Sequence, residues 1–271
     1  MTRSMIATAL LCVFISGSAI AAELPPEIKQ NGVKIAVVPN YPPMEFKDPA
    51  TSTLTGFDVD LGDALGKKLG VKVVWQETSF DQLMPGITTQ RFDAILSGMS
   101  DIKSRQDAAS FIDYLRSGPR FFVQTSRAAE FKEPTALCGK KVGASRRTMF
   151  PKDIAAWSDA HCGASPIQFV GTEGSADART QLRQGRIDAA VQGNETLPYI
   201  MDQEPNVYTP IGETIATQYT GLAVPVKATE LQQALSGALE ALIADGTYKT
   251  LLAKWKLSEN GIEKVTTNAG Q

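Results

Sequence analysis

The 271-residue sequence predicts an α/β protein built as two similar lobes. Strand-like and helix-like segments alternate along the chain, the alternation occurs twice, and one short motif recurs in both halves. Such alternation is typical of a mostly parallel sheet with helices on both faces.

The first 21 residues read as a signal peptide that directs export. Thr2-Arg3 is a short basic start, residues 5–15 are almost purely apolar, and Ala19 and Ala21 fit an A-x-A cleavage site. The apolar run is short for a membrane span, and no other stretch could cross a bilayer. The alternative for this run is a buried N-terminal helix.

The elements of the first half follow from the periodicity of apolar residues and from the positions of glycine and proline. The expected order is a strand over 33–38, a turn at Tyr41-Pro42-Pro43, a helix from Gly56, a strand over 71–75, an interrupted helix over 80–90 and a strand over 92–96. Phe57, Leu61, Leu65 and Leu69 recur every four residues, which gives the first helix one apolar face. Asp58 is its expected N-cap and Gly70 its stop.

The second half repeats this rhythm. Strands are expected over 140–144, 167–170, 187–191 and 221–226, and helices over 153–160, 176–184, from Thr229 and from residue 244. Residues 90–95 (QRFDAI) and 185–190 (GRIDAA) share an Arg-apolar-Asp-Ala step from a helix end into a strand, which favours two similar lobes. The residues after Asn260 carry little pattern and are expected to be disordered.

Charge and cysteines narrow the function classes. The net charge of −2 and the absence of a basic stripe exclude nucleic acid as an expected partner. No metal-ligand cluster occurs, and His161 has no obvious catalytic partner, so no cofactor or metal is expected. Cys12 lies in the leader after Leu11, which argues against a lipid anchor. In an exported chain Cys138 and Cys162 are expected to form a disulfide, worth roughly 3 kcal/mol, with two separate buried thiols as the alternative.

The loop 97–105 is the candidate binding segment. It follows a predicted strand, and open parallel sheets bind ligands beyond the carboxyl ends of their strands. Backbone amides at a helix start suit an anion, and the planar fork of Arg105 can hold a carboxylate through two hydrogen bonds. From spacing alone, a surface ion pair explains Arg105 equally well.

The order of several short motifs resembles the periplasmic solute-binding proteins of ABC transporters, in the polar amino-acid family. The motifs are residues 41–48 (YPPMEFKD), 56–61 (GFDVDL), 80–85 (FDQLMP), 91–94 (RFDA), 97–100 (SGMS) with Arg105, 139–143 (GKKVG), 185–190 (GRIDAA) and 244–248 (ADGTY). Each motif is weak alone, but in this order they span nearly the whole mature chain.

The resemblance implies a two-lobed type II periplasmic-binding-protein fold joined by two crossover strands. It places the first lobe at 22–123 plus 222–271 and the second at 124–221, with hinges near 122–126 and 218–223. It also implies a monomer in the periplasm that closes around a small carboxylate-bearing ligand and delivers it to an inner-membrane permease.

The family's ligand-binding residues carry over to matching positions. Tyr41 and Phe80 match the aromatic pair around the ligand's carbons, and Gly98 matches a backbone carbonyl that accepts from its ammonium. Ser97 belongs to the same loop. The residues matching the carboxylate site are Ser100, Arg105, Thr148 and Met149.

Three departures concern the ligand. Gly193 stands where the family usually has an aspartate for the ligand's α-ammonium. Val38 stands where binders of cationic side chains often have an acid. In the second-lobe anion loop Arg146-Arg147 replaces a glycine-rich stretch, and by Coulomb balance these two added cations favour a more anionic solute. A buried, unpaired ammonium is costly. An amino-acid derivative or organic acid is therefore the expected ligand, unless Glu195 replaces the missing acid. Arg146 and Arg147 are equally explained as solvated loop residues.

Two other functions stay open from the sequence. The family that the motifs resemble shares its fold with dehydratases that act on cyclohexadienyl acids. Glu195 is a conceivable general acid for such an enzyme. No nucleophile–base–acid set is visible, so a binding protein and not an enzyme is expected. A sensor that docks onto a receptor cannot be distinguished from a transport component by these residues.

Overall fold

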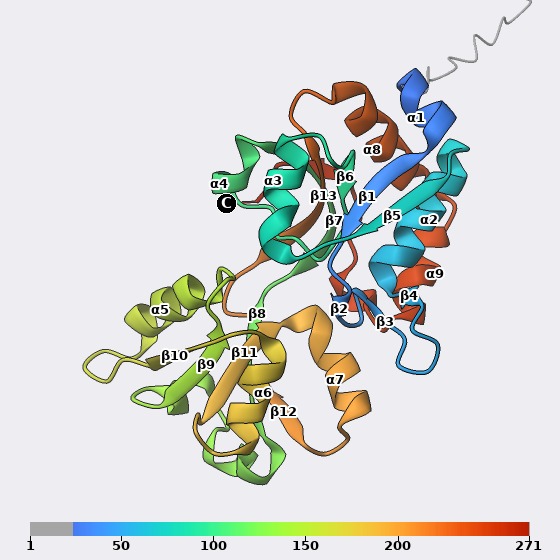
Figure 1. The fold of residues 1–271 in the computed structure, drawn as a ribbon. Coiled ribbons are helices and arrows are strands. Elements are labelled where there is room, and N and C mark those ends of the chain that lie inside the picture. The colour runs from blue at the N-terminus through green and yellow to red at the C-terminus, as the bar shows by residue number, and fades with distance from the viewer. Residues whose placement is uncertain (1–23, 271) are drawn as a thin grey trace, which may run out of the picture.

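A computed structural model describes residues 24–270 of the chain, and Figure 1 shows two lobes joined by extended strands. The predicted signal peptide lies outside the described residues. No helix within residues 24–270 is both long and apolar enough to cross a membrane.

A six-stranded sheet forms the centre of the first lobe, in the order β14-β7-β13-β6-β1-β5. Strands β5 and β6 run parallel to β1, whereas β13, β7 and β14 add antiparallel pairs. Its strands are β1 (Val33–Val37), β5 (Val73–Glu77), β6 (Ala94–Ile95), β7 (Ala109–Ser117), β13 (Gln218–Pro225) and β14 (Thr266–Thr267). A small sheet beside it holds β2 (Asn40–Tyr41), β3 (Glu45–Lys47) and β4 (Leu54–Thr55).

The second lobe is built on a five-stranded sheet in the order β10-β9-β11-β8-β12. Strands β10 and β11 are parallel to β9, and β8 is antiparallel to both β11 and β12. Its strands are β8 (Pro119–Gln124), β9 (Lys141–Ser145), β10 (Gln168–Thr172), β11 (Ala189–Gly193) and β12 (Tyr208–Ile211). Both sheets are thus mixed, since the chain that crosses between lobes adds antiparallel strands to a parallel centre.

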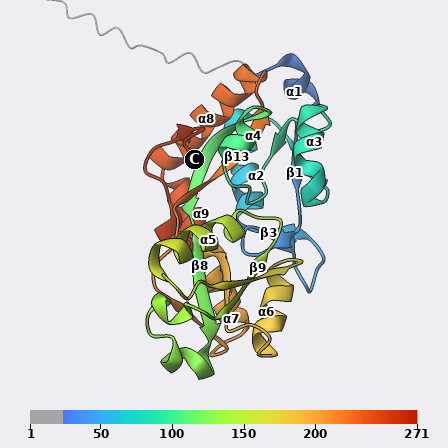
Figure 2. The ribbon, with the colours of Figure 1, turned by 90° about the vertical axis from the view of Figure 1, so that its left-hand side faces the viewer.

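The chain passes between the two sheets at Gly118, directly between β7 and β8, and returns between Ile211 and Gln218. Figures 1 and 2 both show these crossings as the strands that join the lobes. The division of the chain at residues 123 and 222 remains a prediction.

Helices cover both faces of each sheet. Those of the first lobe are α1 (Pro26–Asn31), α2 (Phe57–Leu69), η1 (Phe80–Gln82), α3 (Leu83–Thr88), α4 (Lys103–Gln106), α8 (Thr229–Ala244), α9 (Thr247–Lys254) and η5 (Ser258–Asn260). Those of the second lobe are η2 (Thr125–Glu130), η3 (Pro134–Leu137), α5 (Phe150–His161), α6 (Ser175–Arg183), η4 (Asn194–Thr196) and α7 (Leu197–Gln203).

The alternation of strand side chains divides each lobe's core into two layers. In β1, Ile35 packs with the apolar faces of α2 and α8, while the next residue, Ala36, packs with α3. In β8, Phe121 packs against α5, while Phe122 packs against α6 and α7. Successive strand side chains point to opposite faces, so short apolar runs fill both layers.

The motif shared by the two halves has the same role in each lobe. Asp93 accepts the backbone N–H of Lys34 at 2.7 Å, and Asp188 accepts that of Lys141 at 3.0 Å. Each aspartate also donates its own backbone N–H to the same neighbour's carbonyl oxygen. In both lobes the repeated aspartate therefore anchors the start of its own strand to the neighbouring parallel strand, as expected for a step from a helix end into a strand.

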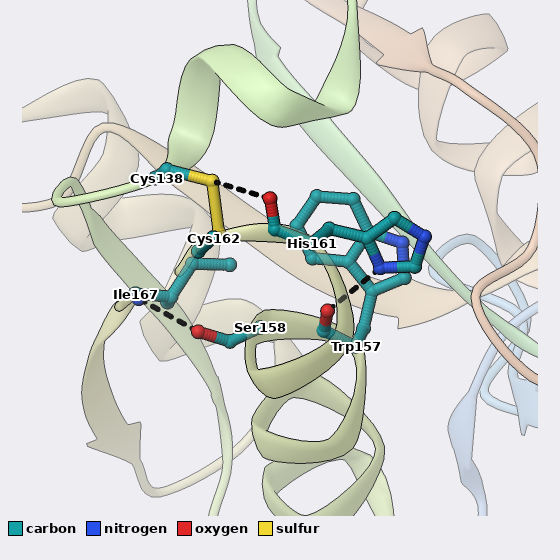
Figure 3. The surroundings of a disulfide bond; sticks show 6 residues. All are labelled: Cys138, Trp157, Ser158, His161, Cys162 and Ile167. Carbon is teal, nitrogen blue, oxygen red and sulfur yellow. Dashed lines mark hydrogen bonds between the residues drawn. A yellow bond between two sulfur atoms is a disulfide. The ribbon is translucent and has the colours of Figure 1, made fainter. Parts of the chain in front are cut away.

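The predicted disulfide between Cys138 and Cys162 is present (Figure 3). It joins the end of η3 to the end of α5, with 5.2 Å between the Cα atoms. Close by, Trp157 and His161 stack with their ring centroids 4.6 Å apart. The Ser158 hydroxyl accepts the backbone N–H of Ile167 at 2.9 Å, so the helix end and the following strand are tied together.

Two local expectations were wrong. The residues after Asn260 are ordered up to Gly270: β14 pairs with β7, and the Gly270 N–H donates to buried Asp101 at 2.7 Å. Asp58 is not an N-cap, because Gly56 holds that position. Its carboxylate is fully buried and accepts hydrogen bonds from distant parts of the chain.

Candidate functional site

The loop that carries Gly98, Ser100 and Arg105 lies beside β13, one of the strands that cross between the lobes, because Ser100 forms a β-bridge with Thr220. Gly98 lies beside Tyr41, since an added Cβ at Gly98 would be 2.9 Å from the Tyr41 ring. The backbone of Gly98 has φ +52°, a left-handed conformation that favours glycine, and its N–H donates to Asp58 at 2.7 Å. The sequence places a glycine here because a side chain would displace the aromatic ring.

Arg105 extends back over the loop that precedes it. Its Nη1 donates to the Ser100 carbonyl oxygen at 2.8 Å, and its guanidinium carbon is 5.7 Å from the centroid of the Phe80 ring. No ion pair joins Arg105 to an acid anywhere in residues 24–270, and burial lowers its pKa. The site therefore holds a half-buried cation that no direct ion pair neutralises, and Asp101 acts on it only through the Coulomb interaction.

A hydrogen-bonded chain links this arginine loop to the second lobe. The Ser100 hydroxyl donates to the Gln218 side-chain oxygen at 3.3 Å, and the Gln218 amide donates to Asp153 of α5 at 2.6 Å. Gln218 is also the register partner of Ser117 across β13 and β7. These contacts bring Gln218 and Ser117, on the strands that cross between the lobes, next to the loop 97–105, and sequence periodicity gave no signal for them.

Glu195 occupies the space in front of Gly193. A Cβ added at Gly193 would be 2.6 Å from the Glu195 carboxyl carbon. One Glu195 oxygen accepts the Tyr41 hydroxyl at 2.6 Å, and the other accepts the Ser117 hydroxyl. The side chain is buried, and this burial raises its pKa. The glycine and the glutamate together place a carboxylate where the sequence alone shows a missing acid.

Two buried carboxylates, Glu45 and Asp58, hold the loop 97–105 in place through hydrogen bonds, and nothing in the sequence indicated that they belong to the site. Glu45 accepts the Ser97 hydroxyl at 2.8 Å, and that hydroxyl in turn accepts the Val38 N–H at 3.0 Å. Asp58 accepts the Tyr114 hydroxyl at 2.8 Å besides the Gly98 N–H. Burial raises the pKa of Asp58 to about 7 and raises that of Glu45 as well. Ser97 is buried within this support.

The two arginines of the second-lobe loop, Arg146 and Arg147, are exposed to solvent. Arg146 pairs with Glu173 at 2.8 Å, and Arg147 lies 3.4 Å from Glu173 and 3.6 Å from Asp81 of the first lobe. Both arginines are exposed and have acidic neighbours, so they add little net positive charge to the site. The Coulomb argument for an anionic solute therefore loses its main support.

Thr148 and Met149 lie at the start of α5. The Thr148 hydroxyl donates to the Ser145 carbonyl at 2.9 Å and accepts the Phe150 N–H at 3.2 Å, which fixes the turn before the helix. Asp153, four residues beyond Met149, contacts Gln218. The start of α5 is thereby held near β13, and direct ligand contacts by Thr148 and Met149 stay a prediction.

Residues 33–258 match the family described as bacterial extracellular solute-binding proteins, family 3. An arginine-binding protein of Corynebacterium glutamicum is 28% identical over 92% of this chain and 82% of its own length. A putative ABC-transporter arginine-binding protein of Escherichia coli K12 is 30% identical over 91% of this chain and 97% of its own length. The histidine-binding periplasmic protein of Salmonella typhimurium is 28% identical, over 94% and 97% of the two chains.

Solved structures of similar proteins share the two-lobed fold. An ancestral arginine-binding protein bound to arginine has a TM-score of 0.71 and 29% identity, over 82% of this chain and 97% of that one. An ancestral amino-acid-binding protein described as a precursor of cyclohexadienyl dehydratase has a TM-score of 0.72 and 28% identity, over 84% and 97%. These similarities confirm the expected fold and the expectation of a binding protein that is not an enzyme.

Proposed function

Because this chain belongs to family 3 of the bacterial extracellular solute-binding proteins, we propose that it is the amino-acid-binding component of an ABC importer. In this proposal it works in the periplasm, binds an amino acid between its lobes and delivers it to an inner-membrane permease. The relatives named as arginine- and histidine-binding proteins support an amino acid as the ligand class.

The observation that carries the proposal is the unpaired charge of Arg105. Within residues 24–270 the half-buried guanidinium donates a single hydrogen bond, to the Ser100 carbonyl oxygen, so it has donors left for a carboxylate. Its planar fork suits two parallel hydrogen bonds. Neighbouring Ser100 and Gly98 belong to the same loop, and the Phe80 ring limits where a bound carboxylate could lie.

Contacts between the lobes support closure around this site. Phe46 of β3 packs on Tyr199 of α7 with ring centroids 5.4 Å apart, and Lys256 pairs with Asp202. Arg147 approaches Asp81 on another side. A ligand that touches both lobes would favour the closed arrangement over open ones, because binding shifts the population toward the state it contacts most.

Titration calorimetry with the twenty common amino acids tests the proposal. We expect at least one to bind, and Arg105→Ala to weaken its affinity by at least about 30-fold, because a desolvated charge pair loses a partner. Arg186→Ala, which removes an exposed arginine of the second lobe, is the matched control and should bind normally. Equal affinities for wild type and Arg105→Ala would contradict the assignment.

A further inference from the structure

We propose that the C-terminal residues 266–270 form a strap that positions Arg105, and that the strap acts on this arginine through Asp101. The inference rests on the proposed function, because it assigns a positioning role toward the site that would hold the ligand's carboxylate. Arg105 remains the residue that would contact the ligand. Figure 1 shows this end of the chain beside α4, the helix that carries Arg105.

The strap begins as an edge strand of the first lobe and ends on two buried acids. After β14 has paired with β7, Asn268 extends the contact by one residue: its N–H donates to the Phe111 carbonyl oxygen at 3.0 Å, and its side-chain oxygen accepts the Phe111 N–H at 2.8 Å. Asn268 has φ +53°, a left-handed conformation that asparagine adopts more readily than most residues. Beyond this turn the chain donates hydrogen bonds to Asp113 and Asp101.

Asp101 and Asp113 are neighbouring carboxyl groups that are both buried, at 1% and 0% exposure. Burial and the nearby charge of Asp101 raise the pKa of Asp113 to about 7. Within residues 24–270 neither acid forms an ion pair with a lysine, arginine or histidine. The Thr266 hydroxyl and the Ala269 N–H donate to Asp113 at 2.9 and 3.2 Å, and the Gly270 N–H donates to Asp101 at 2.7 Å. The strap therefore supplies the donors that stabilise two acids that would otherwise repel each other.

Asp101 connects the strap to both ends of the arginine segment. It directly follows Ser100, whose carbonyl oxygen accepts the hydrogen bond from Arg105. Its second carboxylate oxygen accepts the side-chain amide of Gln106 at 2.7 Å, and the same amide lies 3.3 Å from the Gly270 carbonyl oxygen. The residue before the loop's helix and the residue after Arg105 are thus held by one carboxylate and the strap. A binding side chain keeps its geometry only when such neighbours hold it, so loss of the strap should misplace the guanidinium.

Gly270 allows the strap to be displaced by one methyl group. A Cβ at this position would lie 1.9 Å from the Asp101 carbonyl oxygen and 2.8 Å from its carboxyl carbon. Gly270→Ala must therefore move the end of the strap away from Asp101, while every residue of the loop 97–105 stays unchanged.

Titration calorimetry with the tightest-binding of the twenty common amino acids tests the proposal. Gly270→Ala should weaken binding at least about fivefold, and a chain that ends after Val265 at least about tenfold. Lys264→Ala, which changes an exposed residue just before the strap, is the matched control and should bind as the wild type does. In the Arg105→Ala background the same two changes should weaken binding less than about twofold, because the strap acts through that arginine.

This double-mutant comparison separates positioning from a general loss of structure. A strap that only stabilises the fold would weaken binding by the same factor in both backgrounds, and that result would overturn the proposal. Thermal melts establish which variants are folded. If the shortened chain does not fold, Gly270→Ala and Asn268→Ala, which keep the full length, decide the question.

The outcomes also distinguish this inference from the proposed function. An affinity within about twofold of the wild type in Gly270→Ala overturns the strap's role and leaves amino-acid binding intact. Failure of all twenty amino acids to bind the wild type overturns both proposals together.

Discussion

Replacing Asp58 with asparagine should flatten the dependence of folding stability on pH. Asp58 is fully buried beneath the Gly98 turn, and burial raises the pKa of its carboxyl group from 3.8 to about 7. Asparagine resembles the protonated acid, because each offers one acceptor oxygen and one donor group in the same plane. The variant therefore represents the protein with Asp58 permanently neutral.

The direction in which stability changes with pH follows from proton binding to Asp58. Between pH 3.8 and about 7 the folded protein retains a proton on Asp58 that the unfolded chain releases, so stability falls as the pH rises through this window. The pKa difference corresponds to roughly 4 kcal/mol at ~1.36 kcal/mol per pH unit. Removing the Asp58 charge also relieves Glu45, whose pKa is raised by burial and then by Asp58, so both effects act in the same direction.

Urea unfolding at about pH 4.5 and about pH 7.5 measures the effect. Wild type should lose several kcal/mol more than Asp58→Asn between these two conditions, roughly 3–4 kcal/mol by the same arithmetic. The exposed acid Asp107 gives a control, since Asp107→Asn should follow the wild-type curve. Parallel losses in wild type and Asp58→Asn would refute the claim that the fold holds a proton at this carboxylate.

Other predictions concern the disulfide, the binding loop and the repeated aspartate. Serine at both Cys138 and Cys162 should lower the free energy of unfolding by about 3.5 kcal/mol for their separation of 24 residues, measured in urea; a loss below about 1 kcal/mol would contradict the chain-entropy account. Gly98→Ala should lower the free energy of unfolding by about 1–2 kcal/mol and weaken amino-acid binding, because the added methyl group displaces Tyr41. An affinity equal to that of the wild type, measured by calorimetry, would argue against that contact. Asp188→Ala should cost about 1–3 kcal/mol through the lost anchor of β9, and an unchanged thermal midpoint would count against it.

Local patterns were sufficient for much of the architecture. The four-residue spacing of Phe57, Leu61, Leu65 and Leu69 predicted α2, which begins at Phe57 and ends before Gly70, because a helix face is decided by residues three and four apart. The Arg-apolar-Asp-Ala step predicted equivalent strand starts in both lobes, and the hydrogen bonds of Asp93 and Asp188 agree. Strands such as β7 and β8 went unpredicted, because they are buried on both faces and show no alternation.

Sequence patterns predicted the fold family, the alternation of strands and helices in both lobes and the pairing of Cys138 with Cys162, and the folded chain agrees. The electrostatics of the candidate site, in contrast, depend on contacts that form only on folding. Periodicity assigned Asp58 to a helix cap and left Gly193 as a missing acid, whereas the folded chain buries Asp58 under a loop 40 residues away and fills the space at Gly193 with Glu195. The physical reason is that burial and counter-charges depend on which segments meet in space, and a spacing pattern reports only neighbours along one element.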